Sequence, residues 1–428
     1  MSVRAARMLV IAAVAATVAA LATALAEADP ARADASAHAS AKKQETQWSA
    51  QSRRAARKSV GALSGFDPLV HATAGDVLVS ELKDGRKAEL TLDPALQSHL
   101  TKVLARYEVP YGAVVALEPR TGRVLAYVSH SSANPDAGDL VLDSTPPAAS
   151  VFKVVTSAAL LDAGVPATER VCYGGGLRGI RQADLVDDPR RDKSCVTLSE
   201  ALGGSVNTVF AKLADRRLEP QTLKRYAEAF GFGQALPFDV PMQRSPAEVP
   251  SDRLEFARTA AGFWHVHMSP LHAALMSATI ANGGVMPTAS MVERVSDAQG
   301  KVLYQRSAND FRSVIPASTA RVLGRMMEKT IRSGTARSAF FDQQGLPFLP
   351  GVNAAGKTGS LSTDSPYRAY SWCVAFAPIE KPRIAVAALV VNTPKWRIKG
   401  SYVARETLRK YLIEDATLHR ANAKTNVH

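Results

Sequence analysis

The sequence predicts an α/β protein of the α+β type, with helices packed on a central antiparallel sheet. Strand-like segments separated by tight turns occur near both ends, while residues 145–340 have a mostly helical pattern. A run of strands, a helical middle, hairpin strands and a closing helix is typical of this architecture. The 428 residues are 46% hydrophobic and 21% charged, which excludes a mainly disordered or collagen-like chain.

We expect five parts along the chain. They are a signal peptide or membrane anchor (1–26), a flexible basic tether (27–65), a short strand–helix segment (66–109), a main domain (110–415) and a tail (416–428).

The N-terminus predicts export. Two arginines precede a long uncharged run that ends in Ala24-Leu25-Ala26, a pattern that a signal peptidase could cleave. Cleavage and retention both stay open, because the run is near the length of a bilayer span but consists mostly of alanine. In both cases we expect the chain after residue 27 to lie outside the cytoplasm.

The tether and the net charge indicate the class of partner. The formal net charge of +13 suits an anionic partner. Because export argues against nucleic acid, lipid headgroups or cell-wall carboxylates are the more natural partners. The basic cluster of the tether could rest on an anionic membrane surface, although most such charge runs are simply solvated. Its members are Lys42, Lys43, Arg53, Arg54, Arg57 and Lys58.

The strand signals lie in the short segment and at the two ends of the main domain. Lys83-Asp84-Gly85-Arg86 separates two strand-like runs, as in a β-hairpin. Strands are expected at 77–81, 87–92, 113–117, 124–128, 353–361, 370–376 and 383–391.

Helical spacing of apolar residues predicts the helices. The first follows Asp93-Pro94, and the clearest runs from about 149 to 161 and stops before Gly164. Shorter helices are expected at 198–202, 208–213 and 270–280, and an amphipathic helix at 401–412 closes the domain.

Two of the three cysteines are candidates for a disulfide. Cys172 and Cys195 flank a Gly-, Asp- and Arg-rich stretch that is expected to form a long loop. In an oxidising compartment a bond between them would stabilise the fold by about 3 kcal/mol, and two unpaired thiols are the alternative. Cys373 lies in an apolar run and is expected to be buried.

Ser150-Val151-Phe152-Lys153 places a hydroxyl and an amine one turn apart on the clearest helix. A serine needs an adjacent base to become a nucleophile. Lysine is that base only when neutral, and with an unperturbed pKa of about 10.4 it is mostly charged at pH 7. Burial or a second nearby cation would lower this pKa. The pattern alone is weak, since Ser80 and Lys83 also match it.

Two further motifs complete a possible site. Ser205-Val206-Asn207, at a predicted junction of two helices, offers a proton relay and an amide that could hold a peptide; helix capping is the plain alternative. Lys357-Thr358-Gly359-Ser360 lies on a predicted strand, where its cation could bind a carboxylate and Gly359 permits close approach of a ligand. A surface turn is the alternative there.

The order Ser-x-x-Lys, Ser-x-Asn, Lys-Thr-Gly resembles the transpeptidase domain of penicillin-binding proteins, serine acyltransferases that cross-link peptidoglycan and are acylated by β-lactams. The resemblance covers about residues 90 to 415. Further segments that carry it are 91–97, 112–122, 269–271, 281–284 and 372–378.

The resemblance implies roles for these residues. Ser150 would form the acyl-enzyme, Lys153 would take its proton, and Ser205 and Asn207 would assist proton transfer and hold the donor peptide. Lys357, Thr358, Gly359 and Ser360 would form the substrate-binding strand, and the amides of Ser150 and Ser360 the oxyanion hole. It also implies an all-helical lobe beside the sheet, stem peptides and β-lactams as partners, a location at the periplasmic face of the inner membrane, and neither a metal nor an organic cofactor.

Alternatives stay open. A D,D-carboxypeptidase differs only in using water as acceptor, and a β-lactamase-like hydrolase shares the constellation. A β-lactam sensor or an inert peptidoglycan-binding scaffold are the non-enzyme alternatives. We expect no glycosyltransferase domain, because only the tether and the 66–109 segment precede the main domain. The motifs depart from common members of the family at Val206, where cysteine is frequent, and at Ser360, where threonine is frequent.

Overall fold

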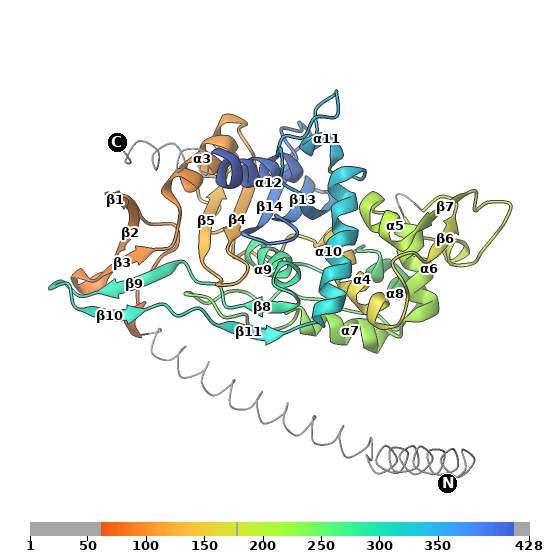
Figure 1. Cartoon of the computed structure of the whole chain (residues 1–428), viewed down its shortest axis with the longest axis horizontal. Helices are drawn as coiled ribbons and strands as arrows, with labels where there is room; N and C mark the ends of the chain where they lie inside the picture. Colours follow the sequence, from red (N-terminus) through yellow and green to blue (C-terminus); the bar gives the residue numbers. More distant parts are fainter. Residues whose placement is uncertain (1–60, 177–178, 415–428) are drawn as a thin grey trace, which may run out of the picture. The chain divides into compact units, whose positions relative to one another are not determined.

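The computed structural model describes residues 61–176 and 179–414 (Figure 1). The expected signal or anchor, the tether up to residue 60 and the tail from residue 416 lie outside these residues. Within the described ranges, no helix combines the length and the apolar character needed to cross a bilayer.

The last residues assigned to the tether differ from the expectation. Leu63 is buried, and the Arg86 guanidinium donates hydrogen bonds to the carbonyl oxygens of Gly61, Ala62 and Ser64. Residues 61–64 therefore pack on the folded domain, because the buried Leu63 and the hydrogen bonds from Arg86 hold them.

A five-stranded antiparallel sheet forms the centre of the domain, as predicted, and every strand expected in it is present (Figure 1). Its order is β12–β13–β14–β4–β5, with bounds Ala355–Asp364, Tyr367–Ala377, Ile384–Asn392, Tyr111–Leu117 and Val124–His130. All residues of β14 are buried, because helices cover both faces of the sheet.

Each face of the sheet carries its own apolar cluster. On one face of the sheet, α9 (Pro270–Ala281) packs against every second residue of the strands, such as Val115 of β4 and Trp372 of β13. On the other face α12 (Gly400–Arg409) and α3 (Pro94–Arg106) pack with the intervening residues, such as Val114 and the buried Cys373. The strand period of two thus separates the two layers.

A mainly helical lobe lies beside the sheet (Figure 1). It contains the predicted helix near residue 150, which divides into a 3₁₀ turn and an α-helix. Its helical elements are η2 (Ala149–Phe152), α4 (Lys153–Asp162), α5 (Leu198–Gly204), α6 (Asn207–Arg217), α7 (Pro220–Ala229) and α8 (Arg253–Ala260). The long helix α10 (Ala317–Arg332), which the sequence analysis did not predict, contacts α5 and β12.

The predicted hairpin of the 66–109 segment belongs to a second sheet. β2 (Val77–Glu81) and β3 (Lys87–Leu90) form it, and β3 pairs with β9 (Val292–Ser296) from the region expected to be mostly helical. The strand order is β1–β2–β3–β9–β10, where β1 spans Ala72–Ala74 and β10 spans Val302–Gln305. A separate pair joins β8 (Val285–Pro287) and β11 (Asp310–Ser313).

Cys172 and Cys195 form a disulfide across the hairpin of β6 (Arg170–Tyr173) and β7 (Ser194–Thr197), where the two residues are register partners. The buried Lys212 ammonium donates to the Cys172 carbonyl oxygen and to the carboxylates of Asp187 and Asp192. The disulfide therefore links the two strands of the hairpin to each other, and the buried Lys212 of α6 links the hairpin and its loop to the helical lobe.

Replacing both Cys172 and Cys195 by serine is expected to lower the free energy of unfolding by about 3 kcal/mol, because the cross-link then no longer restricts the unfolded chain. Urea unfolding followed by circular dichroism measures the change. A reductant should destabilise the natural protein by a similar amount and leave the double variant unaffected, since the remaining cysteine, Cys373, is free. Equal stability of the oxidised protein and the double variant would contradict a stabilising bond.

Candidate active site

Ser150 lies in the 3₁₀ turn η2, immediately before α4. The preceding Ala149 has φ +48°, a left-handed conformation that costs a non-glycine residue about 1 kcal/mol or more. Gly262 packs against this turn so closely that a Cβ would lie 2.4 Å from the Ala149 carbonyl oxygen. The strained turn is thus held by its neighbours, and it leaves Ser150 partly exposed in a cleft.

Lys153 is fully buried one turn after Ser150. Its Nζ lies 2.8 Å from Ser150 Oγ, 2.7 Å from Asn207 Oδ1 and 2.5 Å from the Ala261 carbonyl oxygen. Burial lowers the pKa of Lys153 well below its usual value, and the nearby Lys357 cation lowers it further. Both causes favour the neutral amine.

Ser205 ends α5 in a left-handed conformation, with φ +58°. Its Oγ accepts a hydrogen bond of 2.8 Å from the buried Lys357 Nζ, which also donates to the Thr358 carbonyl oxygen at 2.7 Å. Burial lowers the pKa of Lys357 to about 7. Asn207 starts the next helix, α6, so the helix junction predicted from the sequence brings both polar side chains toward Lys153 and Lys357.

The close packing of β12 on the serine turn depends on Gly359. A Cβ at this position would lie 3.0 Å from Val151 Cγ2 and 3.3 Å from the Ala148 carbonyl oxygen. Trp372, the register partner of Gly359, donates from Nε1 to the Pro147 carbonyl oxygen at 2.9 Å. The strand that carries Lys357 is therefore fixed against the segment that leads to Ser150.

Two adjoining hollows, of about 380 and 490 Å³, share Ser150, Asn207 and Ser360. The first is also lined by Ser205 and Thr358, and the buried Lys153 and Lys357 lie behind these side chains. The structure therefore brings the three sequence motifs together at one cleft. Ser80 and Lys83, which share the spacing of the first motif, lie instead in the peripheral β2–β3 hairpin.

Sequence reasoning missed several residues of the cleft. Thr335, at the end of the α10 segment, lines the first hollow and shares a short hydrogen bond between its hydroxyl and that of Thr358. Trp264, 53% exposed and at φ +41°, lines the second hollow together with Phe263. No motif marks these positions, because the folded chain alone brings them to the cleft.

Comparisons with known proteins agree with this geometry. Residues 112–412 match the penicillin binding protein transpeptidase domain. The chain is 30% identical over 348 residues to the peptidoglycan D,D-transpeptidase PbpA of Mycobacterium tuberculosis, an alignment that covers 72% of this chain and 68% of the relative. It is 28% identical to the stage V sporulation protein D of Bacillus subtilis, covering 75% of this chain and 52% of that protein.

Solved structures give the same result. The ceftriaxone acyl-enzyme of penicillin-binding protein A from M. tuberculosis superposes with a TM-score of 0.64 and 26% identity, covering 77% of this chain and 80% of that one. A D,D-transpeptidase domain from Eggerthella lenta gives a TM-score of 0.65 at 25% identity, with coverage of 78% and 85%. Because family match, fold and the arrangement of the three motifs all agree, this chain belongs to the penicillin-binding protein transpeptidase family.

Proposed function

We propose that this protein is a peptidoglycan D,D-transpeptidase that cross-links stem peptides through an acyl-enzyme on Ser150 and is acylated by β-lactams. The observation that carries the proposal is the position of the Lys153 amine. It is buried near Lys357 and lies 2.8 Å from the Ser150 hydroxyl, which faces the cleft. The transpeptidase names of the relatives and the β-lactam acyl-enzyme of a solved neighbour support the same activity.

Lys153 acts as the general base for Ser150. A neutral lysine amine has two N–H groups and one lone pair. The Asn207 Oδ1 and Ala261 carbonyl oxygens can only accept, so they take the two N–H groups. The lone pair is then left for the Ser150 hydroxyl proton, and the resulting alkoxide attacks the carbonyl carbon of the donor peptide or the β-lactam.

Ser205 returns the proton. Its hydroxyl lies next to the Lys357 ammonium and faces the cleft, so it can donate its proton to the leaving amine of D-alanine. It then regains the proton that Lys153 took from Ser150, which restores both the Ser205 hydroxyl and the neutral base. Asn207 holds a peptide amide while its Oδ1 fixes Lys153. In the second half-reaction the incoming amine of a neighbouring stem peptide replaces the leaving group, and the serine ester is broken to form the cross-link.

The β12 strand binds the substrate carboxylate and stabilises the negative charge that develops on the carbonyl oxygen under attack. The Lys357 cation and the Thr358 and Ser360 hydroxyls supply positive charge and donors, and Gly359 allows the close approach. The amides of Ser150 and Ser360 form the oxyanion hole. Thr335 adds a hydroxyl beside Thr358.

The location outside the cytoplasm follows from the substrate, since relatives with this activity build the cell wall. We place the domain at the periplasmic face of the inner membrane, with residues 1–26 as signal or anchor and the basic tether against anionic lipid. A D,D-carboxypeptidase, a β-lactamase-like hydrolase and a β-lactam sensor differ from this proposal in how the acyl-enzyme is resolved, and an inert scaffold forms no acyl-enzyme. The labelling experiment below separates the β-lactamase-like hydrolase and the scaffold from the proposal.

Ser150→Ala is expected to abolish labelling by a fluorescent penicillin, because the ester can then not form. Gel fluorescence measures the label. The matched control is Ser80→Ala, which removes a serine of the same Ser-x-x-Lys spacing outside the cleft. Stable label on the natural protein that disappears only in Ser150→Ala supports the proposal. Rapid release of hydrolysed drug would indicate a β-lactamase, and an unlabelled natural protein would indicate a scaffold.

Lys153→Arg is expected to reduce the acylation rate by about 10²–10⁴-fold, the usual contribution of a general base. A guanidinium stays charged and cannot accept the serine proton. Stopped-flow acylation by the fluorescent penicillin measures the rate, and near-ultraviolet circular dichroism checks folding. Lys153→Met, which keeps the buried stem without a charge, serves if the arginine variant does not fold. Normal acylation by either folded variant would remove Lys153 from the mechanism.

The pH dependence should report the Lys153 amine. Acid protonates the base, so the acylation rate falls as pH drops through the lowered pKa of Lys153. In Lys357→Gln the neighbouring cation is lost, so the pKa of Lys153 rises. The acidic limb of the pH profile of the acylation rate then moves to higher pH. The control Lys399→Gln removes an exposed cation that also lines the cleft and should leave the limb in place. An unmoved limb in Lys357→Gln would rule out this coupling.

A further inference from the structure

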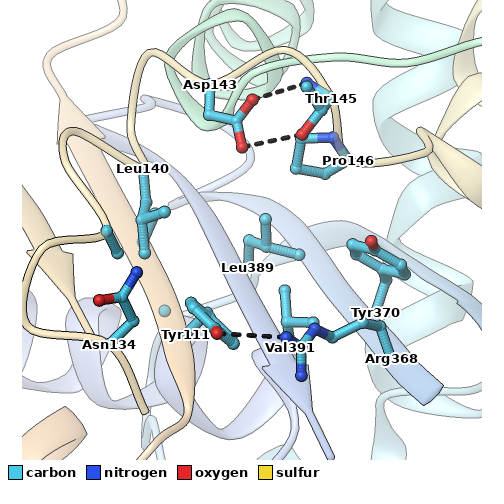
Figure 2. Close-up of a pocket in the computed structure, with 13 residues that line it drawn as sticks. Tyr111, Asn134, Leu140, Asp143, Thr145, Pro146, Arg368, Tyr370, Leu389 and Val391 are labelled. Atoms are coloured by element: carbon cyan, nitrogen blue, oxygen red, sulfur yellow. Dashed lines mark hydrogen bonds between the residues drawn. The ribbon is translucent and has the colours of Figure 1, made fainter. Parts of the chain in front are cut away.

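A further cavity, of about 270 Å³ and separate from the two hollows at Ser150, lies on the same sheet face as α9, near the N-terminal end of β4 (Figure 2). The segment that leads to Ser150 forms one wall, through Leu140, Asp143 and Pro146. β13 forms another wall through Arg368 and Tyr370. This volume is close to the lower end of small-molecule pockets, roughly 300 Å³, so a small ligand fits it and a folded partner does not.

The cavity carries one charge of each sign on different walls. Figure 2 shows Asp143 and Arg368 on different sides, with Leu389 between them. The Asp143 carboxylate accepts 2.9 Å hydrogen bonds from the backbone N–H and the hydroxyl of Thr145. These two bonds fix the carboxylate in place and leave lone pairs for a further donor.

Arg368 is fixed on the other wall. Its guanidinium lies 4.7 Å from the centre of the Tyr111 ring and donates to the Tyr111 hydroxyl at 3.2 Å. Within residues 61–176 and 179–414, neither Arg368 nor Asp143 has a salt-bridge partner at 4.0 Å or less. Burial raises the pKa of the Tyr370 hydroxyl, the Asp143 carboxylate raises this pKa further, and the Arg368 guanidinium lowers it. Both charges therefore influence the same side chain in the cavity wall.

Two half-buried charges of opposite sign, each oriented by a neighbour but not paired, match a ligand that carries both charges. We propose that this cavity binds an amino-acid zwitterion, with its ammonium on Asp143, its carboxylate on Arg368 and its carbon chain over Leu389 and Val391. The ligand is either a free amino acid or the amino-acid end of a peptide side chain, since both present an ammonium and a carboxylate on one carbon. This site is separate from the Ser150 cleft and does not depend on the proposed function.

Isothermal titration calorimetry of the full chain tests the site. D-alanine serves as the free amino acid, and the tripeptide L-Ala-γ-D-Glu-meso-diaminopimelate presents the same group on a side chain. Propionate and ethylamine, which carry one charge each, are the ligand controls. The variants are Asp143→Asn, which keeps an oxygen for Thr145, and Arg368→Gln; Asp136→Asn, an exposed acid of the same loop that does not line the cavity, is the matched control.

Binding of D-alanine or of the tripeptide is expected, with affinity reduced about 10–100-fold in Asp143→Asn and in Arg368→Gln and unchanged in Asp136→Asn. The tighter of the two probes identifies the source of the ligand. Excess benzylpenicillin should leave the binding in place, whether or not it acylates Ser150. Absence of binding, equal binding of propionate, unchanged affinity in both cavity variants, or displacement by benzylpenicillin would each overturn the proposal.

Discussion

The chemistry of the cleft depends on one buried amine. Lys153 is excluded from water on a helix whose other residues are mostly apolar, and within the described part of the chain none of its hydrogen-bond partners is a carboxylate. An isolated buried ammonium is strongly disfavoured, so the site favours the neutral form. The hydroxyl and carbonyl groups around it satisfy this neutral amine. On the proposed roles, the two oxygens that accept from this amine leave its lone pair for the Ser150 hydroxyl.

Close backbone contacts hold the amine, the serine and the strand together. Gly262 touches the turn before Ser150, and Gly359 touches it from β12. Gly203 at the end of α5 lies so close to Gly334 that a Cβ on Gly334 would be 2.1 Å from the Gly203 carbonyl oxygen. At each of these three contacts, segments far apart in sequence meet at a glycine. A Cβ at Gly262 or Gly334 would overlap backbone atoms, and a Cβ at Gly359 would require its neighbours to move by a few tenths of an ångström.

The sequence alone could predict the local parts of this arrangement. The central strands and the helix junction at Ser205 follow from apolar periodicity and turn residues, which are local signals. The pairing of β3 with β9 joins segments about 200 residues apart, and no local pattern records it. The hairpin turn at Asp297 is a local signal that was missed, since its carboxylate accepts from the amides of Gln299 and Lys301. Thr335 is different, because only tertiary packing brings it beside Thr358.

On the proposed roles, a bound substrate couples the two lysines of the cleft. Lys357 has a pKa of about 7, so in the empty cleft it is only partly charged at neutral pH. A bound carboxylate favours the Lys357 cation, and that cation in turn disfavours a proton on Lys153. On the proposed roles, a substrate that carries the carboxylate therefore promotes the neutral base that attacks through Ser150. A ligand without a carboxylate would occupy the same cleft without this effect, so the charge that binds the substrate also selects which substrate reacts.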